Sequence, residues 1–280
     1  MFELSRRQID DFVRAWLAED VGRGDRSTEA VVLPGTSGVA RIEARSRTVI
    51  AGLGIARACF EHLGDVDWRP ECADGDLVDP GTVLARLSGS LRSILTAERT
   101  ALNILGRLSG IATITHLYVE AVSGTPVQVV DTRKTTPGLR QFEKYAVRVG
   151  GGRNHRFGLD DGVLIKDNHI GAAGGVFEAV RRARDAVPHG LRVEVEVTDL
   201  PQLDEAISAG ADAVLLDNMS PEQVAGAVSR AGGKAVLEAS GGITLENIRA
   251  YAETGVDLIS VGALTHSARS ADLSLEVEPT

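Results

Sequence analysis

The chain has 280 residues, of which 43% are hydrophobic and 25% are charged, a balance typical of a soluble globular protein with one or two domains. Its net charge of −9 argues against a nucleic acid or an anionic membrane as partner. The two cysteines, Cys59 and Cys72, are too few for a disulfide framework, and the sequence shows neither a signal core nor a membrane-length apolar run. A cytoplasmic location is therefore expected.

The first third of the chain predicts a mixed α and β domain. Residues 5–18 have apolar side chains at helical spacing and Ser5 as N-cap, and a glycine-broken loop is expected at 19–28. Strand-like pieces between residues 38 and 90 surround a helix at 54–63. Residues 93–122 predict two helices, or one helix broken at Gly106 and Gly110.

From residue 127 onward, short apolar runs alternate with helical patterns. The runs lie at 127–131, 162–167, 191–197, 212–217, 235–240 and 257–262, and the helices near 138–149, 175–186, 200–209, 220–230 and 244–254. This alternation predicts a parallel α/β sheet. Six strands fit either an open doubly wound sheet or a barrel that lacks some regular units, and periodicity does not choose between them. The alternating tail 272–278 predicts a strand that returns to the first domain.

Polar residues occur at the carboxyl end of every predicted parallel strand, where the site of such an architecture forms. In strand order they are Asp131, Arg133 and Lys134; Lys166, Asp167, Asn168 and His169; Glu194 and Glu196; Asp217 and Asn218; Glu238, Ser240, Gly241 and Gly242; and Gly262. This repetition predicts one shared site built by all six strands.

Residues 131–169 form a basic patch on an otherwise acidic chain. They hold eight Lys or Arg against five Asp or Glu, and three of the chain's four lysines. The basic group is Arg133, Lys134, Arg153, His155, Arg156 and Lys166. Because guanidinium groups bind carboxylates in a fork and ammonium groups meet phosphate as point charges, the mixture predicts a ligand with both. A solvated basic face, and a structural role for His155, remain alternatives.

Two further motifs suggest groups that would act on a phosphate or a cation. Glu196 and Asp217 end adjacent strands and could share Mg²⁺, or could simply pair with the basic loop. "SGGITLENI" (240–248) and "SVGALTHS" (260–267) place glycines between a strand and a helix, which suits a two-loop phosphate grip as well as ordinary turns.

Long segments of the chain resemble the quinolinate phosphoribosyltransferase family. They are "ERTALNILGRLSGIAT" (98–113), "DTRKTTPGLR" (131–140), "GGGRNHRFGLDDGVLIKDNHI" (150–170), "EVEV", "LLDN", "EASGGI" and "SVGALTHS". The resemblance implies an N-terminal α/β sandwich domain, here residues 1–108 joined by the C-terminal strand 267–280, and an incomplete parallel α/β barrel at 109–266. It also implies a two-fold dimer, and formation of nicotinate mononucleotide, pyrophosphate and CO2 from quinolinate and phosphoribosyl pyrophosphate with Mg²⁺.

The resemblance also implies roles for individual residues. Arg133, His155, Arg156 and Lys166 would hold the quinolinate carboxylates, joined by Arg99 from the neighbouring subunit. Lys134 would act on the pyrophosphate side, and Glu196 and Asp217 would serve the metal and the ribose. Ser240, Gly241, Gly262 and His266 would grip the 5'-phosphate.

Three other functions compete with this one. A paralogue associated with molybdenum transport shares the fold, but the intact "IKDNH" segment (165–169) favours the quinolinate enzyme. A Schiff-base aldolase could use Lys166 at its strand end. A phosphate-ligand sensor on the same barrel would leave the paired Glu196 and Asp217 unexplained.

Overall fold

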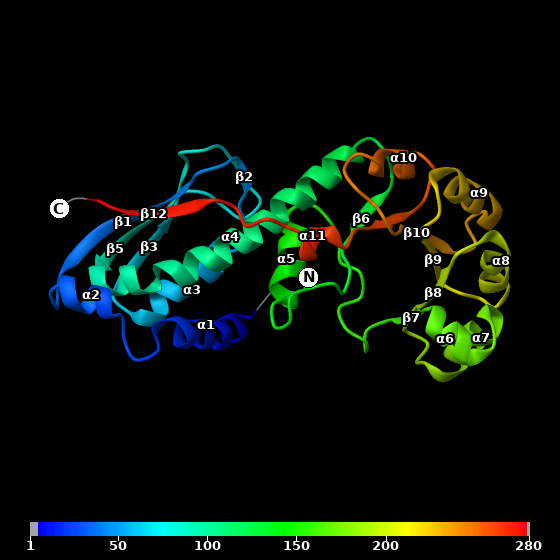
Figure 1. The fold of residues 1–280 in the computed structure, drawn as a ribbon, viewed down its shortest axis with the longest axis horizontal. Helices are drawn as coiled ribbons and strands as arrows, with labels where there is room; N and C mark the ends of the chain where they lie inside the picture. The colour runs from blue at the N-terminus through cyan, green and yellow to red at the C-terminus, as the bar shows by residue number, and fades with distance from the viewer. Residues whose placement is uncertain (1–4, 279–280) are drawn as a thin grey trace. The chain divides into compact units, whose positions relative to one another are not determined.

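The computed structural model describes residues 5–278 and confirms an α/β fold with two domains (Figure 1). The first unit comprises the described residues up to Ile114, residues 141–150 and those from Ala268 onward; the second comprises 115–140 and 151–267. The first contains α1 (Arg6–Val21), α2 (Arg26–Val31), β1 (Ser37–Ala44), β2 (Thr48–Val49), α3 (Leu53–Leu63), β3 (Val66–Pro70), β4 (Leu77–Val78), β5 (Val83–Ser90), most of α4 (Leu91–Ala121), α5 (Arg140–Val149) and β12 (Leu273–Val277).

The first unit is built on a four-stranded antiparallel sheet in the order β12-β1-β5-β3, while β2 and β4 form a separate pair. Along β1 the side chains alternate, and Ala40, Ile42 and Ala44 are fully buried on one face. The alternating tail forms β12, which lies beside β1 with Ile42 opposite Leu275. The last strand of the chain thus completes an edge of a sheet that begins at residue 37.

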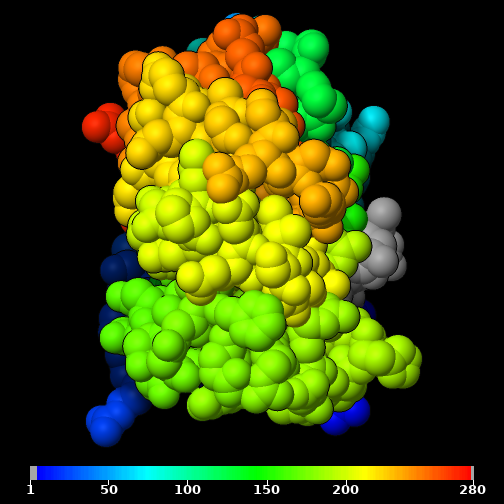
Figure 2. Space-filling view, turned by 90° about the vertical axis from the view of Figure 1, so that its right-hand side faces the viewer, coloured from blue at the N-terminus to red at the C-terminus, as the bar shows by residue number. Residues whose placement is uncertain are grey.

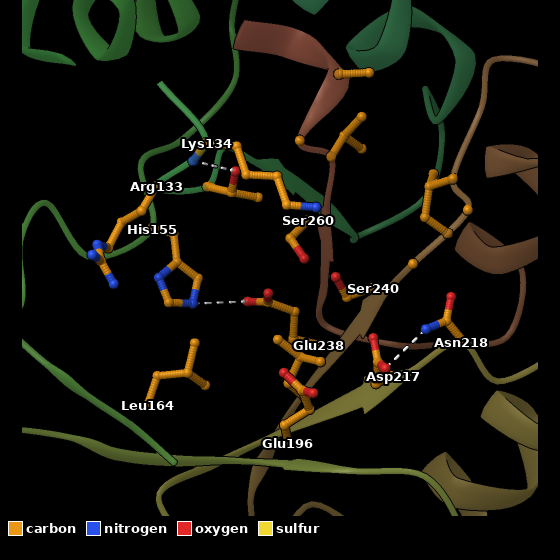
Figure 3. Close-up of a pocket in the computed structure, with 18 of the residues that line it drawn as sticks. Arg133, Lys134, His155, Leu164, Glu196, Asp217, Asn218, Glu238, Ser240 and Ser260 are labelled. Carbon is orange, nitrogen blue, oxygen red and sulfur yellow. Dashed lines mark hydrogen bonds and ion pairs between the residues drawn. The ribbon is translucent and has the colours of Figure 1, made fainter. Parts of the chain in front are cut away.

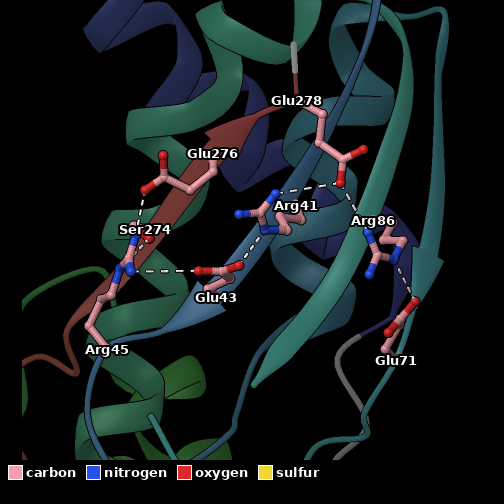
Figure 4. Close-up of polar contacts among 8 residues, drawn as sticks. All are labelled: Arg41, Glu43, Arg45, Glu71, Arg86, Ser274, Glu276 and Glu278. Atoms are coloured by element: carbon pink, nitrogen blue, oxygen red, sulfur yellow. Dashed lines mark hydrogen bonds and ion pairs between the residues drawn. The ribbon is translucent and has the colours of Figure 1, made fainter. Parts of the chain in front are cut away.

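The opposite face of this sheet carries a network of ion pairs (Figure 4). Arg45 donates from Nε to Ser274 Oγ over 2.7 Å, and Arg86 Nη1 lies 3.1 Å from Glu278 Oε1. Arg41 pairs with Glu43 on the same strand. Ion pairs on a protein surface add little to stability, so their main effect is to keep this sheet face polar.

Helix α1 begins as predicted, with a capping box between Ser5 and Gln8. Its Phe12 and Trp16 rings pack on Phe142 of α5 at centroid distances of 5.0 and 5.1 Å. The loop expected at 19–28 is shorter than predicted, because Asp25 accepts from Thr28 N–H and starts the short helix α2.

Helix α4 runs unbroken past Gly106 and Gly110, so both alternatives, two helices and one helix broken at these glycines, are wrong. The glycines serve close packing instead. A Cβ on Gly110 would lie 1.9 Å from the carbonyl oxygen of Arg269, and Ala271 N–H donates to the carbonyl of Gly106 over 2.9 Å. The two small residues therefore form the groove along which the chain approaches β12.

Helix α5 belongs to the first unit, where Phe142, Ala146 and Val147 are fully buried. Buried Glu143 pairs with Arg107 of α4 over 2.7 Å. Lys144, one of the three lysines of the basic segment, is 1% exposed on this helix. Three of the four lysines lie in 131–169, and one of these three is therefore explained by packing in the first unit and not by the cavity.

The second unit contains one six-stranded sheet in the order β6-β11-β10-β9-β8-β7, and every pairing is parallel, as predicted. Its strands are β6 (Gln128–Val130), β7 (Val163–Ile165), β8 (Val193–Val197), β9 (Ala213–Asp217), β10 (Val236–Ser240) and β11 (Leu258–Ser260). Its helices are α6 (Asp167–Ala173), α7 (Val176–Ala186), α8 (Leu200–Ser208), α9 (Pro221–Ala231), α10 (Ile248–Ala252) and α11 (Ala263–His266). The strand order is sequential around the sheet, with the first strand next to the last, as in a barrel. Within the described residues no strand pairing joins β6 to β7, so this barrel is incomplete.

The crossover helices lie on the outer side of this sheet, as Figure 1 shows, and α7 and α8 pack against β8. In the space-filling view the green to orange helices α6 to α9 form the surface on that side (Figure 2). No helix within residues 5–278 is both long and apolar enough to span a bilayer.

Candidate active site

The carboxyl ends of the parallel strands surround a cavity of about 680 Å³ in the second unit. Eleven of the twelve predicted site residues line it: Arg133, Lys134, His155, Arg156, Lys166, Glu196, Asp217, Ser240, Gly241, Gly262 and His266. The twelfth, Arg99, lies on α4 in the first unit, with its side chain 64% exposed. The shared site expected from the strand ends is thus a single cavity.

The loop between α5 and β7 is held in place by the buried carboxylate of Asp131, which directly follows β6. One oxygen accepts from the backbone N–H of His155 over 2.9 Å and the other from the side-chain amide of Asn154 over 2.6 Å. Arg156 then donates from Nη1 to the carbonyl of Gly162 over 2.8 Å. These bonds fix the basic loop against the end of β6.

Two guanidinium groups of the basic patch carry unused donors. The Nε atoms of Arg133 and Arg156 are buried and have no hydrogen-bond partner among residues 5–278. Burial, followed by the nearby charge of Arg133, lowers the pKa of Arg156. Two like charges with buried, unpaired donors are costly unless an anion joins them, so this corner of the cavity is built for a carboxylate or a phosphate.

On the opposite side of the cavity, carboxylates end adjacent strands (Figure 3). Glu196 at the end of β8 pairs with the ammonium of Lys166. Asp217 at the end of β9 accepts from Asn218 Nδ2 over 2.8 Å. The pairing of Glu196 with Lys166 corresponds to the alternative of an ion pair with the basic residues. Carboxylate oxygens are also the donors that Mg²⁺ prefers, and binding of Mg²⁺ by Glu196 and Asp217 stays a prediction.

Gly241 and Gly262, in the two expected phosphate loops, are closely packed, and Gly241 is sterically required. Gly241 has a φ of 92°, and a Cβ there would lie 2.2 Å from the side-chain oxygen of Asn218. A Cβ on Gly262 would lie 3.0 Å from Cδ of Lys134 and 3.2 Å from the ring of His266. The absence of side chains at these positions lets Lys134 and the backbone approach the cavity closely.

Below the basic corner, His155 lies between two buried carboxylates. Its Nε2 is 2.9 Å from Glu194 Oε2 and 3.6 Å from Glu238 Oε2, and its Nδ1 accepts from the backbone N–H of Arg156 over 2.7 Å. Both ring nitrogens are thus engaged with the protein, and a contact of the ring with a substrate would require one of these bonds to be given up. Burial, and next the charge of Glu194, raise the pKa of Glu238 to about 7.

Glu238 was noted at a strand end but not predicted as a site residue. The sequence does contain a signal that could have identified it. Glu238 lies inside the strand segment "AVLEAS" (235–240), and because side chains alternate between the two faces of a strand, Glu238 and Ser240 point to the same side as the other strand-end groups. Ser260 also lines the cavity and was not predicted as a site residue. No sequence signal marks it, because only the three-dimensional sheet brings it beside Glu238 (Figure 3).

Comparison with known proteins identifies the family. The model of the quinolinate phosphoribosyl transferase N-terminal domain matches residues 25–109, and that of the C-terminal domain matches residues 111–276. The chain belongs to the quinolinate phosphoribosyltransferase family. The expectation drawn from the sequence motifs is thereby confirmed.

Full-length relatives agree with this assignment. The chain is 46% identical to a probable nicotinate-nucleotide pyrophosphorylase (carboxylating) of Synechocystis, over 96% of this chain and 92% of the relative. It is also 46% identical to the nicotinate-nucleotide pyrophosphorylase (carboxylating) of Mycobacterium leprae, over 95% and 96% of the two chains. The crystal structure of NadC from Streptococcus pyogenes superimposes with a TM-score of 0.95 at 43% identity, covering both chains completely.

These relatives support the quinolinate enzyme over the molybdenum-associated paralogue and the aldolase. The site also fits an aldolase poorly. A Schiff-base lysine is activated by desolvation or by another cation, whereas Lys166 has a side chain 48% exposed and paired with Glu196.

Proposed function

We propose that the protein transfers phosphoribose from phosphoribosyl pyrophosphate to quinolinate and removes the 2-carboxylate, giving nicotinate mononucleotide, pyrophosphate and CO2. The observation that carries this proposal is a pair of arginines, Arg133 and Arg156, whose buried Nε donors have no partner among residues 5–278. Both arginines line a cavity that is also lined by carboxylates and glycine loops. Such a cavity suits one ligand rich in carboxylate and another rich in phosphate.

In this proposal the basic corner binds quinolinate. Arg133, Arg156 and Lys166 neutralise its two carboxylates, and His155 orders the wall beside them through Glu194. The pyridine nitrogen can then be aligned with the anomeric carbon of the second substrate. Positioning of this kind removes much of the entropic barrier without any covalent intermediate on the protein.

The opposite side of the cavity takes the phosphoribosyl pyrophosphate. Ser240, Gly241, Gly262 and His266 would hold the 5'-phosphate, while the ammonium of Lys134 stabilises the charge that develops on the leaving pyrophosphate. Glu196 and Asp217 would hold Mg²⁺ and contact the ribose. The ion would supply further positive charge to the pyrophosphate oxygens.

We further propose a homodimer in which Arg99 serves the site of the partner subunit. Its side chain is 64% exposed on α4, and its described ionic neighbour is Glu98 at 3.7 Å. In a two-fold dimer an exposed residue of one subunit can complete the site of the other. We place the enzyme in the cytoplasm, since Cys59 and Cys72 are free thiols, as is usual in reducing compartments.

The direct test is to incubate the purified protein with quinolinate, phosphoribosyl pyrophosphate and Mg²⁺ and to measure nicotinate mononucleotide and CO2. Equal amounts of both products are expected, and chelation of the metal should abolish them. Failure to release CO2 from quinolinate labelled in its 2-carboxylate would refute the proposed function.

A further inference from the structure

The group of His155, Glu194 and Glu238 lies in the wall of the cavity, and the binding of substrates described above does not account for Glu238. It projects from β10, is 1% exposed, and both of its carboxyl oxygens lack a hydrogen-bond partner among residues 5–278. It nevertheless lines the same cavity as Arg133, Arg156 and Lys166. Figure 3 shows its side chain near His155 and Ser260. A buried carboxyl without hydrogen bonds is costly as an anion, and far less so as a neutral acid.

The hydrogen bonds of His155 indicate where the proton of this group lies. Because Nδ1 accepts the backbone N–H of Arg156, the ring proton is on Nε2, and Nε2 donates it to Glu194. The imidazole is then neutral, and it compensates Glu194 by a hydrogen bond. The remaining carboxyl, Glu238, is the member of the group that carries an acidic proton.

The surroundings of Glu238 favour this protonated form. The groups that face it are Glu194 from β8, His155 from the loop before β7, Asp131 after β6, Ser260 from β11 and the apolar Leu215 from β9. Burial, followed by the charges of Glu194 and Asp131, raises the pKa of Glu238 to about 7 against the opposing effects of His155 and Ser260. A neutral carboxylic acid at a cavity wall near pH 7 is the form required of a proton donor.

The proposed reaction needs such a donor. When the carbon–carbon bond to the 2-carboxylate breaks, CO2 leaves and the electron pair stays on the ring carbon next to the cationic nitrogen. A new carbon–hydrogen bond must then form, so each turnover consumes one proton. Arg133, Arg156 and Lys166 are needed as cations for the carboxylates, and the proton of His155 is engaged by Glu194.

We propose that Glu238, held as a carboxylic acid in the wall of the cavity, gives its proton to the ring carbon that CO2 leaves. This inference rests on the proposed function and adds the source of the hydrogen in the product. Donation leaves Glu238 as a carboxylate 3.6 Å from Nε2 of His155, and a proton from solvent then restores the acid.

The test uses Glu238→Gln, which keeps the shape of the side chain and removes the acid. In a single turnover the variant should release pyrophosphate within about threefold of the wild-type rate, but form nicotinate mononucleotide at least about a hundredfold more slowly, the usual range for loss of a general acid. The wild-type rate of nicotinate mononucleotide formation should fall as pH rises above about 7, because the acid form of Glu238 is lost. This falling part of the pH–rate profile, the alkaline limb, should be missing in the variant.

Glu194→Gln is the matched control. It removes the neighbouring charge but keeps the acid on Glu238, so product should still form, with the alkaline limb moved to lower pH because the pKa of Glu238 falls. Glu238→Asp should restore part of the rate together with the limb. If Glu238→Gln fails to fold, the shift in Glu194→Gln remains the test.

The outcomes separate this inference from the proposed function. If the wild-type protein makes no nicotinate mononucleotide, the proposed function fails. If the wild-type protein is active but Glu238→Gln forms product within threefold of its rate and keeps the alkaline limb, only the role of Glu238 is overturned. An unmoved limb in Glu194→Gln overturns it as well.

Discussion

Nicotinate differs from quinolinate by one carboxylate, and the cavity should respond strongly to its loss. The Nε atoms of Arg133 and Arg156 are buried without partners among residues 5–278, so a missing carboxylate leaves a guanidinium unpaired. Removing one partner of a buried ion pair costs about 3–5 kcal/mol, and the low end applies here because both arginines are only half-buried. About 3 kcal/mol corresponds to a preference for quinolinate of about 150-fold in kcat/KM.

The assay compares both acids at saturating phosphoribosyl pyrophosphate and measures pyrophosphate release. Arg133→Ala and Arg156→Ala should then have different effects on the ratio of kcat/KM for quinolinate to kcat/KM for nicotinate. The variant that lacks the partner of the 2-carboxylate should lower this ratio at least about tenfold, whereas the other variant should slow the turnover of both acids alike. Arg181→Ala, on the surface helix α7 and paired with Glu178, is the control and should leave the ratio unchanged. Turnover of the two acids within tenfold of each other would refute the reasoning.

Three further predictions test other parts of the molecule. Lys134→Arg should lower kcat/KM about a hundredfold, about 2.7 kcal/mol, because Cδ of the lysine packs beside Gly262 and a planar fork cannot replace a compact ammonium there; a near-wild-type rate would contradict this. Arg99→Ala and Lys134→Ala, each inactive alone, should recover about a quarter of wild-type activity when mixed as dimers, since half the dimers are mixed and each has one intact site; mixed dimers without activity would exclude a shared site. Gly110→Ala should lower the melting temperature by several degrees, since the added Cβ meets the carbonyl of Arg269 at about 1–3 kcal/mol, whereas Gly54→Ala, which meets nothing within 4 Å, should not; equal melting curves would show that the groove tolerates a methyl group.

The sequence predicted most of what placed the site, because the alternation of strands and helices determines that strand ends converge. It could not choose between an open sheet and a barrel, since that depends on which strands pair at the edges. Lys144 shows a second limit: its position in a basic segment suggested the site, but the amphipathic face of α5 buries it in the first unit. Glu238 shows a third, because its protonation follows from neighbours that lie far away in the chain, Glu194 and His155.

The return of β12 to the first unit also affects how the chain is completed during synthesis. Between the end of β1 at Ala44 and the start of β12 at Leu273 lie about 230 residues, so at 5–20 residues per second β1 remains an unpaired edge for about 10 to 45 s. The barrel segment is made in that interval and can fold before the sheet that precedes it is finished. An exposed strand edge invites pairing with other chains, and the charged Arg41 and Glu43 along β1 are the kind of residues that discourage it. The charges of β1 that pair in the finished sheet thus have an earlier use, because they discourage pairing between nascent chains.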